Sequence, residues 1–193
     1  MKSSKKGGGI VMLVVVLGLI TFVCALLLGA VNQITAPLIE QNDANTRNMA
    51  MSEIIADAEF TEVEVPEEVS KPTDKNATAI TGVYKATKDG ADAGYCVQVN
   101  PKGFGGALTM IVGINADGTV AGAKVTAHAE TPGLGAKSQD AEWIAQYAGQ
   151  PADGSLAVTK DGGTINAITG ATITSRAVTT GVNAAAEYVA ALG

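Results

Sequence analysis

The sequence predicts an α+β domain tethered to a membrane by a single N-terminal helix. A stretch of 25 residues without any charge, 7–31, follows three lysines at the start of the chain. Four short segments rich in Val, Ile, Thr and Tyr lie between residues 80 and 128, and a segment with helical periodicity ends the chain. These patterns indicate a membrane helix, then an antiparallel sheet and a C-terminal helix.

The composition excludes several classes of protein. The 193 residues suffice for one modest domain with accessory segments. An apolar content of 47% excludes a largely disordered chain, and a formal net charge of −6 argues against a nucleic-acid-binding protein. With two cysteines and one histidine, the chain has neither a disulfide framework nor the usual ligands of a zinc site. We therefore predict no metal site and no nucleic-acid partner.

Residues 10–31 are the predicted transmembrane helix. At 1.5 Å per residue they span about 33 Å, enough to cross a hydrocarbon layer of about 30 Å. Lysines in the preceding tail, 1–9, place that tail in the cytoplasm, so the rest of the chain would be extracellular or periplasmic at the cell (inner) membrane; these lysines are Lys2, Lys5 and Lys6. A cleaved secretory signal is the alternative, but no Ala-x-Ala site follows the apolar run before Asn32.

Residues 32–78 are interpreted as a juxtamembrane helix and an acidic linker. The sequence Thr35-Ala36-Pro37 is expected to end the spanning segment, and a weak apolar stripe indicates a separate helix over 38–58. The linker is expected to be a solvated loop, because it is broken by Pro66 and Pro72 and is rich in glutamate. Its acidic residues are Glu62, Glu64, Glu67 and Glu68.

Residues 79–193 are the predicted folded domain. Its strands are expected over residues 80–87, 94–99, 107–114, 120–128 and, near the end, 155–158. The turn sequence Asn115-Ala116-Asp117-Gly118 predicts a hairpin between the third and fourth of them. A short helix is expected over 140–147 and a longer one over 175–192. The apolar stripe of the longer helix consists of Val178, Val182, Ala185 and Val189.

The segment before the last helix, residues 166–176, is the first candidate site. It carries four hydroxyl side chains, and Gly170 and Ala171 add little bulk between two of them. The unpaired N–H groups at a helix start attract anions, so this segment could hold a phosphate group. The alternative is a capping segment in which Thr174 or Ser175 satisfies the helix end.

Residues 128–137 form the second candidate site. A strand is expected to end at His128, and an irregular loop follows. In that loop Glu130 and Thr131 offer polar contacts, and Leu134 between two glycines could meet a flat ligand. An ordinary surface turn is the alternative. No serine or cysteine nucleophile motif accompanies His128, so we predict no catalytic residue.

Together these segments resemble the FMN-binding domain family. Thr169-Gly170-Ala171-Thr172 is similar to its flavinylation motif, S/T-G-A-T. Gly103-Phe104-Gly105-Gly106, the Asp117-Gly118 turn and Glu130-Thr131-Pro132-Gly133-Leu134-Gly135 follow the family's order. The resemblance extends through the membrane segment. It points to the G subunits of Rnf ion-translocating electron-transfer complexes, which are related to the C subunit of the sodium-pumping NADH:quinone oxidoreductase.

The resemblance implies that a flavin transferase attaches FMN, taken from FAD, through a phosphoester to Thr172. In the family, the transferase recognition pattern commonly begins with Asp six residues before the acceptor. Asn166 stands there in this chain, which keeps the size of the side chain but loses its charge. The other expected cofactor-binding residues are Thr169, Gly170, Ala171, Thr174, Glu130, Thr131, Gly133 and Leu134.

The function implied is that of an electron-relay subunit with covalent FMN. It would pass electrons between the ferredoxin and NAD branches of a translocase that moves Na⁺ or H⁺, and would have no complete activity alone. Expected partners are the other membrane and peripheral subunits, including the second flavinylated subunit, and the flavin transferase. The alternatives are a flavinylated relay of another extracellular or quinone-linked redox system, and a membrane-tethered binding or sensory module without a redox cofactor.

Overall fold

The computed structural model describes residues 7–67 and 78–192. The chain divides into two units, residues 1–45 and residues 46–193, and each is described by itself. Some residues used in the sequence predictions lie outside the described ranges; these are Lys2, Lys5, Lys6, Glu68 and Pro72.

Helix α1 (Gly7–Ile54) is one continuous helix of 48 residues. The sequence indicated two helices, with the second ending near Ala58, and this expectation is wrong. Pro37 lies inside α1, where it removes one backbone hydrogen bond without ending a helix that is well formed on both sides. The helix ends before Asp57, whose φ of 59° is incompatible with continuation.

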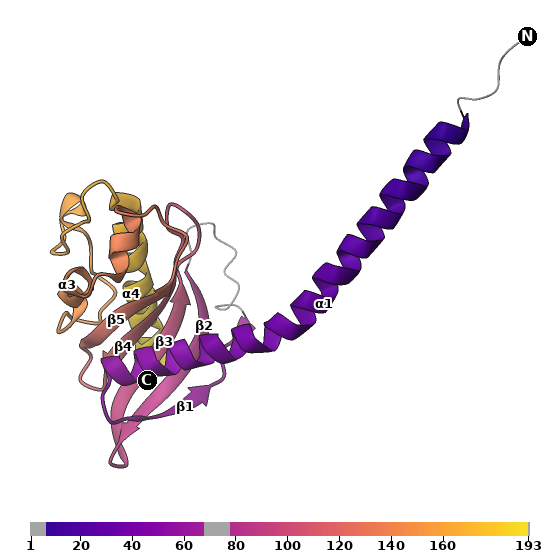
Figure 1. Ribbon diagram of the computed structural model, residues 1–193. Coiled ribbons are helices and arrows are strands. Elements are labelled where there is room, and N and C mark those ends of the chain that lie inside the picture. The colour runs from indigo at the N-terminus through magenta and orange to yellow at the C-terminus, as the bar shows by residue number, and fades with distance from the viewer. Residues whose placement is uncertain (1–6, 68–77, 193) are drawn as a thin grey trace, which may run out of the picture. The chain divides into compact units, whose positions relative to one another are not determined.

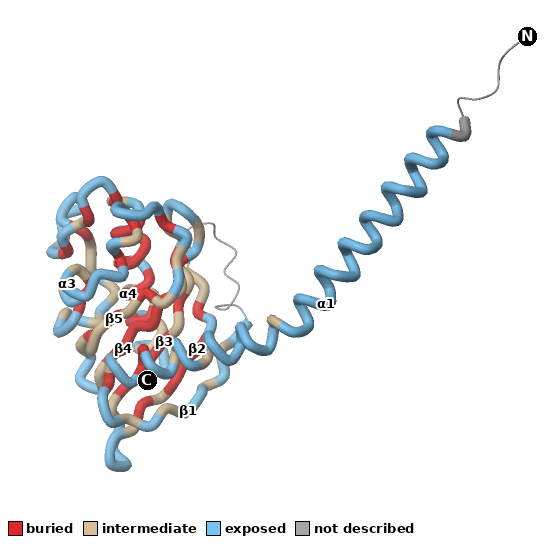
Figure 2. Tube along the Cα trace, viewed as in Figure 1, coloured by how far each residue is buried: buried red, intermediate tan, exposed pale blue. Residues whose placement is uncertain are grey.

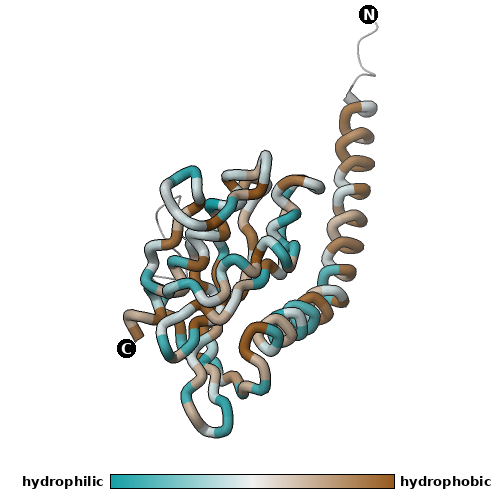
Figure 3. The backbone as a smooth tube through the Cα atoms, turned by 90° about the vertical axis from the view of Figure 1, so that its left-hand side faces the viewer, coloured by the Kyte–Doolittle hydropathy of each residue, from teal (hydrophilic) through white to brown (hydrophobic). Residues whose placement is uncertain are grey.

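The first unit contains the apolar part of α1. Among the described residues, α1 is the one helix that is long and apolar enough to cross a membrane. Its large hydrophobic side chains from Ile10 to Val31 are all exposed. Figure 3 shows this run of hydrophobic residues along the helix. A surface of this kind needs a lipid environment or a protein partner to cover it.

The second unit is built on a five-stranded antiparallel sheet with its strands in chain order (Figure 1). The strands are β1 (Glu59–Val63), β2 (Ala79–Lys88), β3 (Ala91–Asn100), β4 (Thr109–Asn115) and β5 (Val120–Ala127). The last four confirm the strands predicted between residues 80 and 128. The predicted hairpin is also confirmed, because the Asn115 N–H donates to the Thr119 carbonyl at 2.8 Å.

Two strand predictions were wrong. Part of the expected acidic loop is strand β1, in which Phe60 pairs with Ala86; an edge strand tolerates glutamates on its solvent side. Conversely, residues 155–158 form no strand. The Leu156 N–H and carbonyl bond to the Asn183 side chain of α4 at 3.2 and 2.8 Å, and Val158 makes only an isolated bridge with Ile165.

The remaining elements follow β5. They are the short 3-10 helices η1 (Gly135–Gln139), η2 (Ala145–Tyr147) and η3 (Thr159–Asp161), with α3 (Ala141–Ile144) between the first two, and then the helix α4 (Thr172–Leu192). The helix expected over 140–147 is therefore a turn of α-helix followed by 3-10 helix. Helix α4 begins at Thr172, three residues earlier than predicted.

The main core lies between α4 and one face of the sheet. Val178, Val182 and Ala185 of α4 are fully buried in one cluster with strand residues such as Val97 and Val112, and Val189 packs against it partly buried, which confirms the predicted stripe. Figure 2 shows buried residues along α4. A smaller cluster covers the other face of the sheet, where the end of α1 packs. Its members are Ala50, Met51, Ile55, Tyr84, Ala86, Cys96 and Ile111. With both faces covered, the sheet is a rigid base for the loops at its edge.

Candidate functional site

The two candidate segments, residues 128–137 and 166–176, lie around one cavity of about 350 Å³. The second of these segments contains the start of α4. Phe104 comes from the loop after β3, and Thr131 and Leu134 come from the loop after β5. Lys160 comes from η3, and Thr172 is the first residue of α4. The cavity therefore joins residues that are up to 70 positions apart in the chain, from Phe104 to Thr174.

A buried carboxylate holds these segments together. Glu130 is only 6% exposed. Its Oε1 accepts a hydrogen bond from the Gly105 N–H at 3.0 Å, and its Oε2 accepts one from the Thr174 hydroxyl at 2.7 Å. Glu130 and Thr174 were both expected at the cofactor site, and both line the cavity. Their side chains are engaged with each other, so Thr174 does not cap the helix.

Glycines allow the close approach to that carboxylate. A Cβ on Gly103 would overlap Glu130 Oε1, and a Cβ on Gly135 would overlap Glu130 Oε2. The Gly103 N–H also donates to the Gly106 carbonyl at 2.7 Å, which closes a tight turn. The glycine-rich sequence after β3 therefore makes a tight turn and brings the backbone close to the Glu130 carboxylate.

Thr172 is the half-buried first residue of α4. The Lys160 ammonium donates a hydrogen bond to its Oγ1 at 3.0 Å. The first N–H groups of a helix have no intrahelical partner, and its N-terminus carries a partial positive charge. Thr172 therefore lies in a positively charged environment. Sequence reasoning missed Lys160, because no local pattern relates a lysine to a threonine twelve positions later.

The residues before Thr172 form a loop that Ser175 holds in place. The Ser175 hydroxyl accepts a hydrogen bond from the Ile168 N–H at 2.9 Å and donates one to the Ala171 carbonyl at 3.0 Å. Ser175 lies within α4 and its hydroxyl holds the preceding loop against the helix. It does not have the helix-capping role that was the alternative interpretation of this segment. Gly170 has a φ of 79°, which favours glycine, and it is exposed together with Thr169.

Three large apolar side chains remain exposed around the cavity. They are Phe104, Leu134 and Ile173, which are 70%, 43% and 51% exposed. Large apolar side chains beside a polar anchor are typical of a site for a flat, amphipathic ligand. Leu134 was predicted for such a contact, and Phe104 and Ile173 are additional.

The cavity coincides with a known domain. The family model of the FMN-binding domain matches residues 103–187, which include every residue that lines this cavity. The G subunit of the Na⁺-translocating ferredoxin:NAD⁺ oxidoreductase complex of Acetobacterium woodii is 38% identical over 183 residues, covering 86% of this chain and 87% of that relative. The chain belongs to the G-subunit family of ion-translocating oxidoreductase complexes.

Other relatives in the G-subunit family have similar extents of match. The G subunit of the proton-translocating ferredoxin:NAD⁺ oxidoreductase complex of Clostridium ljungdahlii is 34% identical, covering 87% of this chain and 85% of that relative. The G subunit of the ion-translocating oxidoreductase complex of Erwinia tasmaniensis is also 34% identical, covering 86% of this chain and 83% of that relative. A crystal structure of Shewanella oneidensis NqrC has 25% identity and a TM-score of 0.48, covering 64% of this chain and 62% of that chain.

In this G-subunit domain, an ion pair ties the η3 segment to α4. The Arg176 guanidinium donates to both Asp161 carboxylate oxygens, with distances of 2.7 and 2.6 Å. These hydrogen bonds hold the pKa of Asp161 below its usual range. The pair keeps the residue next to Asp161, Lys160, close to Thr172.

We expect the Asp161–Arg176 ion pair to be lost in acid. Because folding lowers the pKa of Asp161, the stabilisation is present above the usual aspartate pKa of about 3.9 and disappears as the pH falls through the lower folded value. Asp161→Asn should therefore melt at a slightly lower temperature than the wild type at pH 7, and this difference should shrink progressively as the pH is lowered below about 4. Thermal unfolding followed by Trp143 fluorescence measures the difference at each pH. A difference that does not shrink in acid would contradict this assignment.

Of the remaining residues predicted for the G-subunit site, Thr131 lines the cavity, whereas Gly133 and Thr169 do not. Thr131 and Gly133 are exposed in the loop after β5. His128 accepts a hydrogen bond from the Glu130 N–H through Nδ1 at 3.1 Å, which gives the histidine a role in the shape of the loop. Asn166 is exposed, and its carbonyl accepts a hydrogen bond from the Trp143 indole at 2.7 Å.

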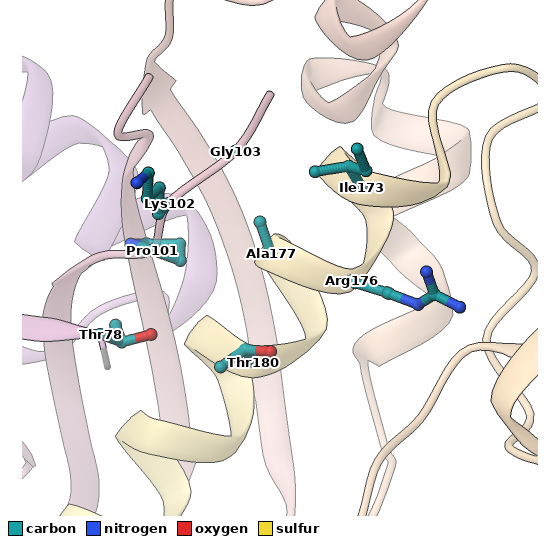
Figure 4. Close-up of a pocket in the computed structure, with 8 residues that line it drawn as sticks. All are labelled: Thr78, Pro101, Lys102, Gly103, Ile173, Arg176, Ala177 and Thr180. Atoms are coloured by element: carbon teal, nitrogen blue, oxygen red, sulfur yellow. The ribbon is translucent and has the colours of Figure 1, made fainter. Parts of the chain in front are cut away.

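A second cavity of about 390 Å³ shares the lining residue Ile173 with the first (Figure 4). Lys102 and Arg176 line it, but Figure 4 shows the Arg176 side chain directed away from Lys102 and Pro101 across α4. The Arg176 guanidinium is engaged with Asp161. Because the two cations do not converge on a common point, this cavity is not our candidate cofactor site.

Proposed function

We propose that this chain is the electron-relay subunit of an Rnf-type complex and carries FMN covalently bound at Thr172. The observation that carries the proposal is the position of Thr172 at the N-terminus of α4, beside a cation and inside the cavity of a matched FMN-binding domain. The relatives from Acetobacterium woodii and Clostridium ljungdahlii belong to ferredoxin:NAD⁺ oxidoreductases that translocate Na⁺ and protons, respectively. The proposed complex couples electron transfer between ferredoxin and NAD to one of these ions.

The residues present fit FMN. A cavity of about 350 Å³ lies within the size range of ligand pockets. Phe104, Leu134 and Ile173 would contact the flat ring, and Thr131 and Gly133 would lie beside it. The phosphate group would lie at the start of α4, where Thr172 and Lys160 meet. Thr169, Gly170 and Ala171 would form a slim loop next to the anchor.

Attachment is a phosphoryl transfer with no redox change. The Thr172 Oγ1 forms a bond to the phosphorus of the FMN half of FAD, the bond between that phosphorus and the AMP half breaks, and the hydroxyl proton leaves. AMP is the second product, and a flavin transferase supplies the catalysis. The phosphoester keeps one negative charge, which the N-terminus of α4 stabilises.

Covalent attachment suits the proposed location. Bound FMN supplies electron transfer in steps of one or two electrons. A site without a covalent bond loses its ligand by mass action where the free ligand is scarce, as expected outside the cytoplasm. A covalent bond to Thr172 would prevent dissociation of FMN. Phe104, Leu134 and Ile173 would shield its ring from water.

The proposed topology has residues 10–31 in the membrane and the tail, 1–9, in the cytoplasm. Residues 32–78 would connect the membrane helix to the FMN-binding domain, 79–193, on the extracellular or periplasmic side. The other Rnf subunits, including the second flavinylated one, would surround the apolar part of α1. A reporter enzyme fused after Gly193 should be active only outside the cytoplasm; activity in the cytoplasm would overturn this electron route.

The attachment is tested by expressing the full chain with and without a flavin transferase. With the transferase, a denaturing gel should show a fluorescent band, and the intact mass should increase by FMN less one water. Without the transferase, the band should be colourless. A chain that stays colourless with an active transferase would instead favour a membrane-tethered binding or sensory module.

Asn166→Asp should accelerate flavinylation. The Asn166 side chain is exposed, and its backbone is held by Trp143 and Gln146, so the substitution leaves the fold intact. A hydrogen bond to a charged group is roughly twice as strong as a neutral one, so a gain of about 1 kcal/mol in transferase binding would raise the initial rate about fivefold. A timed gel-fluorescence assay measures this rate. An unchanged rate would show that the transferase does not use the charge.

A further inference from the structure

We infer that Lys160 is the cation of a phosphate subsite at Thr172, where it would hold the phosphoester that anchors the flavin. This inference rests on the proposed function, because it concerns the same threonine. The sequence motif does not include Lys160, which reaches Thr172 only through the tertiary fold.

The distance between the two side chains carries the inference. The Lys160 Nζ lies 3.0 Å from Thr172 Oγ1 and donates a hydrogen bond to it. After attachment, Oγ1 becomes a bridging ester oxygen, which is a weak acceptor. The non-bridging phosphate oxygens, which carry the charge, are bonded to the phosphorus that Oγ1 itself carries. A side chain that reaches the hydroxyl therefore also reaches these oxygens, without movement of the backbone.

The backbone that carries Lys160 is well held. The Thr159 N–H donates to the Ile165 carbonyl at 2.8 Å, which closes the base of the loop. The Asp161 carboxylate pairs with Arg176 of α4, one turn after Thr172. Lys160 lies between Thr159 and Asp161, the two residues that make these interactions. Its ammonium is therefore presented to the start of α4 by a fixed segment, as a preorganised anion site requires.

The charge of Lys160 is available for a ligand. Both oxygens of the neighbouring Asp161 carboxylate accept hydrogen bonds from Arg176. Among residues 7–67 and 78–192, Thr172 is the only hydrogen-bond partner found for the Lys160 ammonium. Lys160 also lines the cavity that contains Thr172. Asp161 acts on Lys160 through its charge but accepts its hydrogen bonds from Arg176, so the partner that the ammonium itself contacts is a neutral hydroxyl. A phosphoester on Thr172 would place a negative charge at that contact.

The first test is lysine acetylation of the full chain, prepared with and without flavin transferase. Peptide mass spectrometry measures the labelling rate of each lysine. An adjacent phosphate favours the charged, unreactive form of an amine, so attachment should lower the rate at Lys160 about tenfold. Lys88 and Lys124 serve as internal references, because they pair with Asp57 and Glu53 away from the cavity. Their rates should be the same in both preparations.

The second test compares Lys160→Met with Lys160→Arg, and Lys88→Met is the matched control. Only the flavinylated fraction of each protein is examined, by quenching of flavin fluorescence with neutral acrylamide. Loss of the cation should raise the quenching constant toward that of free FMN. Arginine should preserve the wild-type value, because it also binds phosphate. The control should not differ from the wild type.

The outcomes separate this inference from the function on which it rests. Flavinylated wild-type protein whose Lys160 is acetylated as fast as in the unmodified protein would overturn the subsite alone. An acrylamide quenching constant for Lys160→Met equal to that of the wild type would do the same. A wild-type chain that acquires no flavin from an active transferase would overturn the proposed function, and the subsite with it.

Discussion

Thr172→Ala should abolish covalent flavinylation, and Thr172→Ser should preserve it. The reason is chemical, because only a hydroxyl oxygen at this position can form the phosphoester. The fold should tolerate both changes. Thr172 is half-buried at the first position of α4, and its side chain contacts the Lys160 ammonium without supporting the core. The expected loss of flavin is therefore complete, while the effect on stability is about 0.5 kcal/mol or less.

Gel fluorescence and intact mass measure the result, with the variants expressed beside an active flavin transferase. Thr180→Ala is the matched control, because it removes an exposed hydroxyl from α4 outside the motif and the cavity but leaves Thr172 in place. This control should be labelled. Fluorescence of Thr172→Ala in a denaturing gel would mean that the flavin is attached elsewhere.

Glu130→Ala should destabilise the domain by about 2–4 kcal/mol, because it removes two hydrogen bonds to a buried carboxylate and leaves a cavity. Those bonds join the Gly105 loop, the loop after β5 and Thr174 of α4. Losing them should also loosen the cofactor cavity, whose lining includes Glu130. Glu130→Gln keeps the shape and one acceptor oxygen, so it should cost less. Chemical denaturation of the unflavinylated full chain measures both losses.

A second substitution tests whether Gly135 is in direct contact with the Glu130 carboxylate or only packs near it. Gly135→Ala places a methyl group against Glu130 Oε2 and 2.7 Å from Thr174 Oγ1, so it should destabilise the wild type. In the Glu130→Ala background the first clash is absent, and the cost of Gly135→Ala should be smaller. Equal costs in the two backgrounds would contradict the close contact between Gly135 and the carboxylate.

Much of the fold was predictable because its signals are local. The strands between residues 80 and 128 are rich in β-branched side chains, and the Asn115–Gly118 turn specifies their last hairpin. The stripe of Val178, Val182 and Ala185 identifies the buried face of α4. Each pattern is contained within one element, so the sequence shows it without knowledge of the other elements.

The errors arose where partners distant in the chain decide the structure. The acidic segment at residues 59–63 becomes a strand because β2 offers it a free edge. Residues 155–158 do not become a strand because the Asn183 side chain satisfies the Leu156 backbone. Helix α1 continues through Pro37, where the sequence indicated a break, and its last turns bury Met51 and Ile55 on the sheet.

By itself, the sequence determined the apolar N-terminal helix and the antiparallel sheet, because hydrophobic period and turn residues are local properties of a chain. Thr172 was singled out only by the resemblance of its motif to that of a known family. Only the tertiary structure decided that Glu130 joins three segments and that Lys160 lies 3.0 Å from Thr172 Oγ1. Charged side chains interact through space, over distances that depend on how loops pack. For that reason the residues that complete a binding site can be absent from the motif that identifies it.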